Sequence, residues 1–220
     1  MVSTARDVLR YPAVRRYLLS TALAAVGLNI LVTVLFKQAF DITGDTLAIG
    51  LIGLAQFIPA VMLVLVSGWV ADRFDRRRVT ALFLLARTLC AVGFVMYSQS
   101  DSGSIWPLFA IAFVFGAADA MLAPSRRSIA PLLAPTELFP QVVALWTATF
   151  TASAIVGPVI GGFLYSVGPA QAYALGGVLE FAAIIPILLI VYAREPGRIT
   201  DRPTLHTALE GLRFVRHTPV

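Results

Sequence analysis

One stretch decides how this chain folds: Gly68-Trp69-Val70-Ala71-Asp72-Arg73-Phe74-Asp75-Arg76-Arg77-Arg78. A long apolar run without charges ends here, and six charged residues then fall within seven positions, 72–78. Moving an arginine into hydrocarbon costs several kcal/mol, so such a cluster holds a helix end at the membrane surface. The stretch therefore predicts that a hydrophobic helix leaves a lipid bilayer at this point.

The composition of the whole chain is that of a membrane protein. Of 220 residues, 58% are hydrophobic and 13% are charged, and the mean hydropathy is +0.83, whereas ordinary soluble domains contain about 25% charged residues. A sequence pI near 9.9 would suggest nucleic acid as the partner of a soluble protein. Here the arginines gather at the ends of apolar runs, so we expect the positive charge to orient the chain in the bilayer and we expect no nucleic-acid partner.

Uncharged apolar segments of about 20 residues predict six membrane-spanning helices. The expected spans are about 17–36, 46–71, 79–98, 105–123, 140–165 and 172–193, between a cytoplasmic N-terminal segment at 1–16 and an amphipathic cytoplasmic linker at 194–220. Of 16 arginines, only Arg87 lies inside an expected span, and the other 15 flank one set of helix ends. The positive-inside rule therefore predicts a multi-pass protein of the inner membrane with both termini in the cytoplasm.

The order of residues in the charged stretch is more detailed than a membrane anchor requires. Gly68 stands one helical turn before Asp72, where it would let a neighbouring helix come close, and an acid among arginines gains nothing as an anchor. The stretch resembles the signature loop between helices two and three of the major facilitator superfamily. The match runs through Gly68, Asp72, Arg73, Arg76 and Arg77. Asp75 stands where the pattern usually has glycine, which is similar to the branch that exports drugs and siderophores. A plain stop-transfer cluster is the alternative interpretation.

This resemblance implies a fold and a function. The fold would be an all-α membrane protein of six transmembrane helices, arranged as two inverted three-helix repeats, and it would form the N-terminal half of a twelve-helix transporter. The function would be proton-coupled export of small amphipathic molecules, such as drugs or siderophores, by alternating access. The partners would be the lipid bilayer, the substrate, protons and the missing C-terminal half, and no cofactor is expected. The alternative is a truncated or half-transporter protein that does not transport without a second half.

An enzyme is the least favoured of the three interpretations of the sequence. The chain has no phosphate-binding glycine loop and no nucleophile with a plausible base. Cys90 is its only cysteine, and its two histidines, His206 and His217, stand far apart. We therefore expect no catalytic residues and no metal site.

A second pattern lies in the expected fifth helix. It consists of Ser153, Gly157, Pro158, Gly161 and Gly162. Close packing of helices explains such small residues, and that interpretation stays open. The pattern also resembles the fifth-helix motif of superfamily exporters that exchange substrate for protons, with Ser153 in place of a glycine. The arginine that many proton antiporters carry in helix four is not evident here.

The few polar groups inside the expected spans are candidate functional residues. Arg87, Asp119 and Glu180 each need a partner or a wet cavity, because an isolated charge in the bilayer is costly. For Arg87 we favour an ion pair between helices, whereas Glu180 could bind a proton or a cationic substrate. Asn29 would bond a neighbouring helix or face a substrate cavity.

Asp119 is also expected to take part in gating. It lies about one turn from the cytoplasmic end of the fourth span, where it could pair with Arg73 or Arg76. Such pairs would close the cytoplasmic side in one state and break in the other. The expected gating set is Gly68, Asp72, Arg73, Asp75, Arg76, Arg77 and Asp119.

Overall fold

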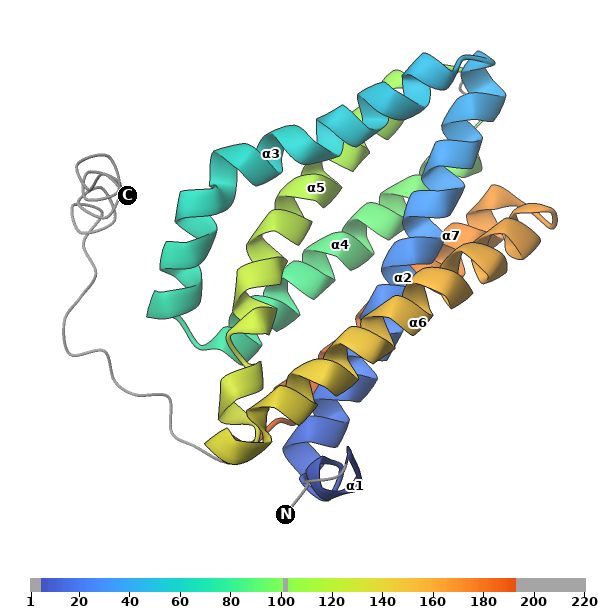
Figure 1. Ribbon diagram of the computed structural model, residues 1–220. Coiled ribbons are helices and arrows are strands. Elements are labelled where there is room, and N and C mark those ends of the chain that lie inside the picture. Colours follow the sequence, from blue (N-terminus) through green and yellow to red (C-terminus); the bar gives the residue numbers. More distant parts are fainter. Residues whose placement is uncertain (1–4, 101–102, 193–220) are drawn as a thin grey trace, which may run out of the picture.

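The computed structural model describes residues 5–100 and 103–192, and every regular element in these residues is helical (Figure 1). Six helices are long and apolar enough to cross a membrane. They are α2 (Pro12–Thr43), α3 (Thr46–Arg73), α4 (Arg76–Ser98), α5 (Trp106–Arg127) with η1 (Ala130–Leu132), η2 (Thr136–Leu138) with α6 (Phe139–Tyr165), and α7 (Pro169–Ala182) with α8 (Ile184–Leu188). A further short element is α1 (Ala5–Val8). The predicted all-α bundle of six spans is confirmed.

The helix ends follow from the local sequence. Helix α2 begins at Pro12, whose missing N–H is not needed in a first turn, and it ends where Gly44 adopts a left-handed φ of 67°. Asp45 then caps α3 by accepting a hydrogen bond from the backbone N–H of Leu47 at 2.9 Å. Helix α2 therefore continues to Thr43, beyond the end of the span expected at about 17–36.

The sixth span also differs from the prediction. Helix α7 stops at Ala182, a turn follows at Ala183, and α8 ends at Leu188, whereas the sequence predicted one helix over 172–193. Pro186 explains the interruption, because its ring cannot donate the hydrogen bond that a continuous helix would make to the carbonyl of residue 182. The expected linker at 194–220 lies outside the described residues.

The packing of the helices repeats itself. Helix α3 packs on α5, and α6 packs on α2; α5 packs on α4, and α2 packs on α7; α4 and α7 pack on each other (Figure 1). This pattern of neighbours is unchanged when α2, α3 and α4 are exchanged for α5, α6 and α7. The two inverted three-helix repeats are therefore visible in the contacts of the bundle.

The core lies between α2, α4, α5 and α7 and has two apolar clusters. One is at the end where α3 stops and α4 starts, called the arginine end here, and includes Tyr17, Leu84 and Leu122. The other is at the opposite, far end, where Phe94 and Tyr173 stack with ring centroids 5.0 Å apart. The functional charges lie between these clusters.

Helices α3 and α6 contribute least to this core. Large apolar side chains along both are exposed, among them Phe57, Met62, Val159 and Phe163. Such a surface cannot face water, so it faces lipid or another apolar helical unit.

Candidate functional site: a buried charge cluster

Three charged side chains from three helices meet inside the bundle. Arg87 of α4 donates to Asp119 of α5, with 2.8 Å between Nη1 and Oδ1, and to Oε1 of Glu180 of α7. The side chains of Arg87 and Glu180 are buried, whereas that of Asp119 is 46% exposed. These three residues, called the charge cluster below, run from the interior of the bundle to its surface.

The structure corrects one expected pairing. Asp119 was predicted to bind Arg73 or Arg76 near the membrane surface, but it binds Arg87. Arg76 instead donates to the backbone carbonyl of Ser128 at 3.0 Å, and Arg73 lies over the ring of Trp69, 5.2 Å from its centroid. The acid of the fourth span therefore belongs to an interhelical cluster of charges.

Aromatic and glycine residues hold the charge cluster in place. The guanidinium of Arg87 lies over the ring of Phe115, 5.1 Å from its centroid, which favours a cation in an apolar site. On the other side, a Cβ added at Gly27 would lie 2.8 Å from the carbonyl oxygen of Gly176 and 3.2 Å from Cγ of Glu180. Glycine at 27 thus lets α2 approach α7 beside the carboxylate, a role that the spacing of glycines did not single out in the sequence.

The break between α7 and α8 comes one turn after Glu180. Ser20 of α2 donates through its hydroxyl to the carbonyl oxygen of Ala183 at 2.8 Å, so α2 is bonded to the turn between α7 and α8. Interrupted helices beside a buried charge are a common feature of transporter binding sites. This contact could not be predicted from the sequence, because Ser20 is an ordinary small residue of an apolar helix.

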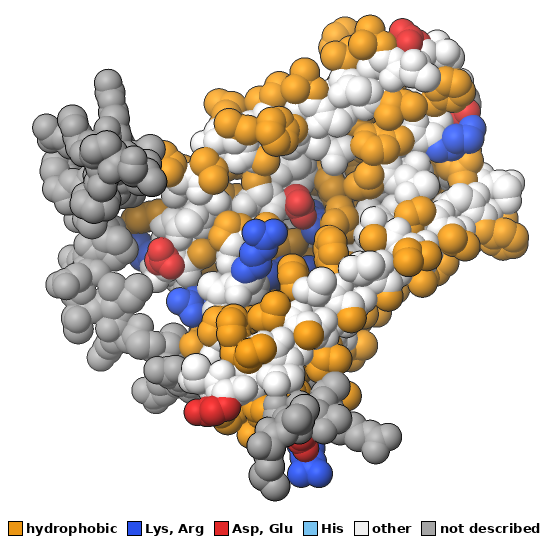
Figure 2. Space-filling model, in the orientation of Figure 1, with side chains coloured by type: hydrophobic (Ala, Val, Ile, Leu, Met, Phe, Trp, Pro, Cys, Tyr) orange, Lys and Arg blue, Asp and Glu red, His pale blue; other side chains and the backbone are white. Residues whose placement is uncertain are grey.

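The charges of the cluster are not fully satisfied. Arg87 Nε and Glu180 Oε2 are buried and have no hydrogen-bond partner. Arg126, at the end of α5, acts electrostatically on Glu180 and adds a second positive charge to this region. In Figure 2, acidic and basic side chains lie in the middle of the face that carries α3, α5, α2 and α6, recessed among apolar side chains. Asp119 is the member of the charge cluster whose side chain is exposed, so the cluster reaches the surface of the bundle through it.

Metal binding finds no support in the described residues. They contain no group of three or more His, Cys, Asp or Glu side chains that could hold a metal ion. Arg87 also occupies the position between the two carboxylates.

The signature loop forms the start of α4. Asp75 caps this helix by accepting from the backbone N–H of Arg77 at 2.9 Å, and it pairs with the Arg77 side chain at 3.1 Å. Burial acts to raise the pKa of the Asp75 carboxyl, but the hydrogen bonds from the Arg77 side chain and backbone outweigh burial and leave the pKa lowered. The backbone φ of Asp75 is −60°, so aspartate replaces the usual glycine without strain.

The remaining members of the expected gating set differ in their contacts. Arg77 also donates to the carbonyl of Ile190 and lies over the ring of Tyr192. Asp72 is exposed, and a Cβ added at Gly68 would meet nothing within 4 Å. The close helix approach predicted at Gly68 is therefore not found within the described residues.

The helix-five pattern packs α6 against α2. A Cβ added at Gly157 would collide with the Cβ of Asn29, and one added at Gly161 would lie 3.3 Å from Cα of Ile30. Gly162 faces open space, and the hydroxyl of Ser153 donates to its own helix, at Thr149. Two of the three glycines thus act in close packing.

Asn29 and Pro158 complete this contact region. The Asn29 amide donates to the carbonyl of Ala25 at 2.7 Å, so it bonds its own helix and not the neighbouring helix that we considered. Pro158 lies inside α6, which continues through it. Both residues are part of the α2–α6 contact and lie apart from the bonds of the charge cluster.

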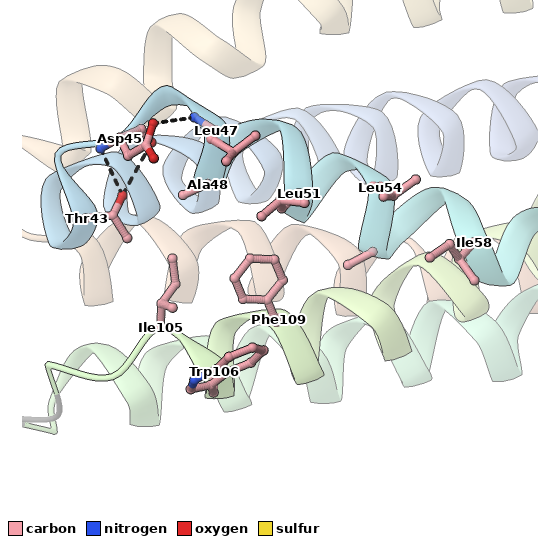
Figure 3. A pocket seen from close by; sticks show the side chains of 11 residues that line it. Thr43, Asp45, Leu47, Ala48, Leu51, Leu54, Ile58, Ile105, Trp106 and Phe109 are labelled. Carbon is pink, nitrogen blue, oxygen red and sulfur yellow. Dashed lines mark hydrogen bonds between the residues drawn. The ribbon is translucent and has the colours of Figure 1, made fainter.

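A pocket of about 470 Å³ lies at the far end, between α3 and α5 (Figure 3). Its lining is aliphatic and aromatic apart from Thr43 and Asp45, whose hydrogen bonds form the turn between α2 and α3. The sequence could not predict this pocket, because uniformly apolar helices do not reveal which side faces a neighbour.

Comparison with known proteins agrees with the geometry. The family model described as Major Facilitator Superfamily matches residues 17–220. The chain is 27% identical over 218 residues to the enterobactin exporter EntS of Shigella boydii serotype 18, which covers 96% of this chain and 50% of that protein. It is 27% identical over 210 residues to the uncharacterized MFS-type transporter YfiS of Bacillus subtilis strain 168, covering 92% and 49%. The chain thus spans about half the length of the curated relatives it matches.

Proposed function

The chain belongs to the Major Facilitator Superfamily, and on that premise we propose that it is the N-terminal half of a secondary transporter that exports small amphipathic molecules by alternating access. Membership of this family and six apolar spans make it a multi-pass membrane protein, and they indicate a transporter rather than an enzyme. In the proposed orientation, it lies in the inner membrane with both termini in the cytoplasm, so the arginine end is the cytoplasmic end.

One observation carries the proposal: Arg87 binds carboxylates from two other helices in the middle of an apolar bundle. Charges in such a place are costly and mark ion or substrate pathways. One arginine faces two carboxylates, so a proton added to either carboxylate weakens one of the two ion pairs. Protonation would therefore change how α4 is tied to α5 and α7, which is the coupling that a proton-driven transporter needs.

Export is favoured over import by three features together. Relatives in the comparison carry the name of an enterobactin exporter. The helix-five pattern and the aspartate at position 75 resemble those of exporters. Drugs and siderophores are accordingly the proposed classes of substrate, and their apolar parts would suit the largely apolar surfaces of this bundle.

Transport by the product of the whole reading frame tests the proposal. The protein is reconstituted in liposomes, and enterobactin and ethidium serve as probes. We expect an imposed pH gradient to drive uptake of a probe into vesicles that hold the transporter inside out. Glu180→Gln should reduce this proton-driven transport at least tenfold but keep exchange of labelled for unlabelled substrate, because exchange needs no net proton movement.

Thr88→Val, at the position after Arg87 in α4, is the matched control, since the Thr88 hydroxyl donates to the carbonyl of Leu84 in its own helix. Proton-driven transport that survives Glu180→Gln unchanged would refute the assigned role of the charge cluster. If neither probe moves with any variant, and the 220-residue chain accumulates as a stable protein, the half-transporter that does not transport is the better description.

The signature loop is the proposed cytoplasmic gate, with Asp72 as the test residue because it is exposed and lies outside the charge cluster. A charge contact that Asp72 makes in only one of the two states would shift their ratio tenfold if it contributes about 1.4 kcal/mol. We predict that Asp72→Asn leaves the amount of protein in the membrane unchanged but lowers export about tenfold. Arg78→Gln is the control for charge alone, and equal export by both variants and the parent would mean that the loop is only an anchor.

A further inference from the structure

Three hydroxyl groups in the core make no hydrogen bond. Thr21 of α2, Thr80 of α4 and Ser125 of α5 are 0% exposed, and none of their side-chain oxygens has a partner. A buried hydroxyl without a partner costs about 1–3 kcal/mol. Native proteins rarely keep such groups unless water or a ligand satisfies them.

These hydroxyls differ from the others in the spans. A serine or threonine in an apolar helix ordinarily donates to the carbonyl one turn earlier. Thr88, Thr149 and Ser153 do so, at 2.9, 2.8 and 2.8 Å. Thr21, Thr80 and Ser125 leave that simple bond unmade, so their oxygens are available inside the bundle.

The three hydroxyls belong to one region. Thr21 lies within one turn of Tyr17 and Ala24, Thr80 one turn before Leu84, and Ser125 one turn from Leu122 and Ile129. All five of these neighbours are members of the same apolar cluster at the arginine end. Helices α4 and α5 pack on each other, and Tyr17 of α2 donates to the backbone carbonyl of Arg126 of α5 at 3.2 Å, so the three unbonded oxygens belong to one buried cluster.

This region lies between the charge cluster and the arginine end. Thr80 precedes Arg87 by two turns, or about 10 Å along α4, and Ser125 follows Asp119 by about 9 Å along α5. Both displacements are toward the arginine end. Arg126 Nη2 and Glu180 Oε2 are likewise buried without a partner, and the two residues act on each other electrostatically.

We propose that Thr21, Thr80 and Ser125 bind ordered water inside the core, and that this water connects Oε2 of Glu180 with the arginine end of the bundle. The site takes water because its polar atoms are few, neutral and spread over three helices. Arg126 follows Ser125 in the chain, and Arg126, Arg87 and Asp119 are the charged groups that act on Glu180. In transport, a proton would leave bulk water at the arginine end and pass through this water to Oε2; that role rests on the proposed proton coupling, whereas the water site does not.

Stability measurements test the water site. Thr80→Val and Ser125→Ala remove one hydroxyl each from the full protein in detergent, and Thr88→Val removes a bonded one from the same helix. Because a bound water would lose a partner, we expect the Tm to fall by a few degrees in Thr80→Val and Ser125→Ala, and to change less in Thr88→Val. A Tm that rises or stays the same in both test variants means that the hydroxyls are dry, and it overturns the proposal.

A high-resolution structure of the parent protein gives an independent answer that needs no variant. Ordered water density within hydrogen-bond distance of at least two of the three hydroxyls supports the site, and apolar contact without density refutes it. Neither measurement depends on transport, so a failure of the transport assay leaves this result readable.

Infrared spectroscopy tests the route. The band of the protonated Glu180 carboxyl group is identified by its absence in Glu180→Gln. After a drop in pH, this band should appear at least tenfold more slowly in Thr80→Val than in the parent or in Thr88→Val. If Thr80→Val leaves the rate unchanged and Asp119→Asn slows it, the proton reaches Glu180 from the exposed face of α5, and the route through Thr80 is wrong.

Discussion

Arg87 is the residue on which the interior of the bundle depends most. Glu180 is completely buried and Arg87 is its ion-pair partner, so removal of the arginine leaves an uncompensated charge in the core. We predict that Arg87→Met lowers the free energy of unfolding by about 3–5 kcal/mol. The double variant Arg87→Met/Glu180→Met should recover most of that loss, because no unpaired charge remains at its centre.

Unfolding of the purified proteins in detergent measures both effects. Asp119→Asn is the control, with a much smaller loss, since its side chain is 46% exposed. Losses that simply add in the double variant would contradict the assigned pairing.

Asp75 separates helix capping from ion pairing. Asparagine keeps the cap on α4 and loses the pair with Arg77, whereas alanine loses both. We predict that Asp75→Ala destabilises the protein by about 1 kcal/mol and that Asp75→Asn costs clearly less. Thermal unfolding measures the stability of both variants. Equal losses of stability in Asp75→Ala and Asp75→Asn would show that the cap contributes little.

The pH dependence of the Asp75 contribution follows from its lowered pKa. A carboxyl whose pKa is lower in the folded state than in the unfolded state stabilises the fold when the pH is above its unfolded-state pKa. This contribution is lost as the pH falls through the folded-state pKa. The difference between Asp75→Ala and the parent should therefore be constant near neutral pH and shrink only in acid below the usual aspartate range. A difference that disappears near pH 7 would contradict this origin.

At the scale of helices, close packing of α2 on α6 depends on one glycine more than on its neighbours. A Cβ at Gly157 collides with Asn29, whereas a Cβ at Gly162 meets nothing. We predict that Gly157→Ala costs about 1–3 kcal/mol through overpacking, and that Gly162→Ala is neutral or slightly stabilising. Each variant adds one methyl group to the same helix, and the two differ only in its position. Equal thermal stability of the two variants would therefore refute the packing role of Gly157.

The sequence predicted the helices well because charge and hydropathy determine them. The arginine-rich turn at 72–78 and the uncharged runs were enough for six spans. Their ends were less certain: α2 continues past Lys37 because that residue pairs with Asp41 four positions on and Gly44 is the first strong stop.

The site was only partly predictable from the sequence. Arg87, Asp119 and Glu180 stood out as charges in apolar runs, but their pairing depends on helix rotation and depth, which uniformly apolar helices do not reveal. Hence Asp119 was assigned to the wrong arginines. The contact of Ser20 with the broken end of α7 required the packed structure, since no local pattern marks it.

At the scale of the whole molecule, the orientation in the membrane is the main prediction. Ser166 is exposed in the turn between α6 and α7 at the far end, and Arg78 is exposed at the arginine end. In a background with Cys90 replaced by alanine, we expect Ser166→Cys to react with an impermeant thiol reagent outside intact cells. Arg78→Cys should react only after the membrane is opened, and the reverse pattern would invert the topology.

The ion pair between the two repeats also has a consequence for synthesis. Arg87 precedes Glu180 by 93 residues and Asp119 by 32. At about 5–20 residues per second, the ribosome makes Asp119 within seconds of Arg87, and Glu180 several seconds later again. The nascent chain must therefore shelter an arginine until its partners arrive, first the carboxylate of α5 and then that of α7. The first repeat alone contains neither Asp119 nor Glu180. Its third helix, α4, therefore cannot take its final position in the bilayer until the ribosome has synthesised the second repeat.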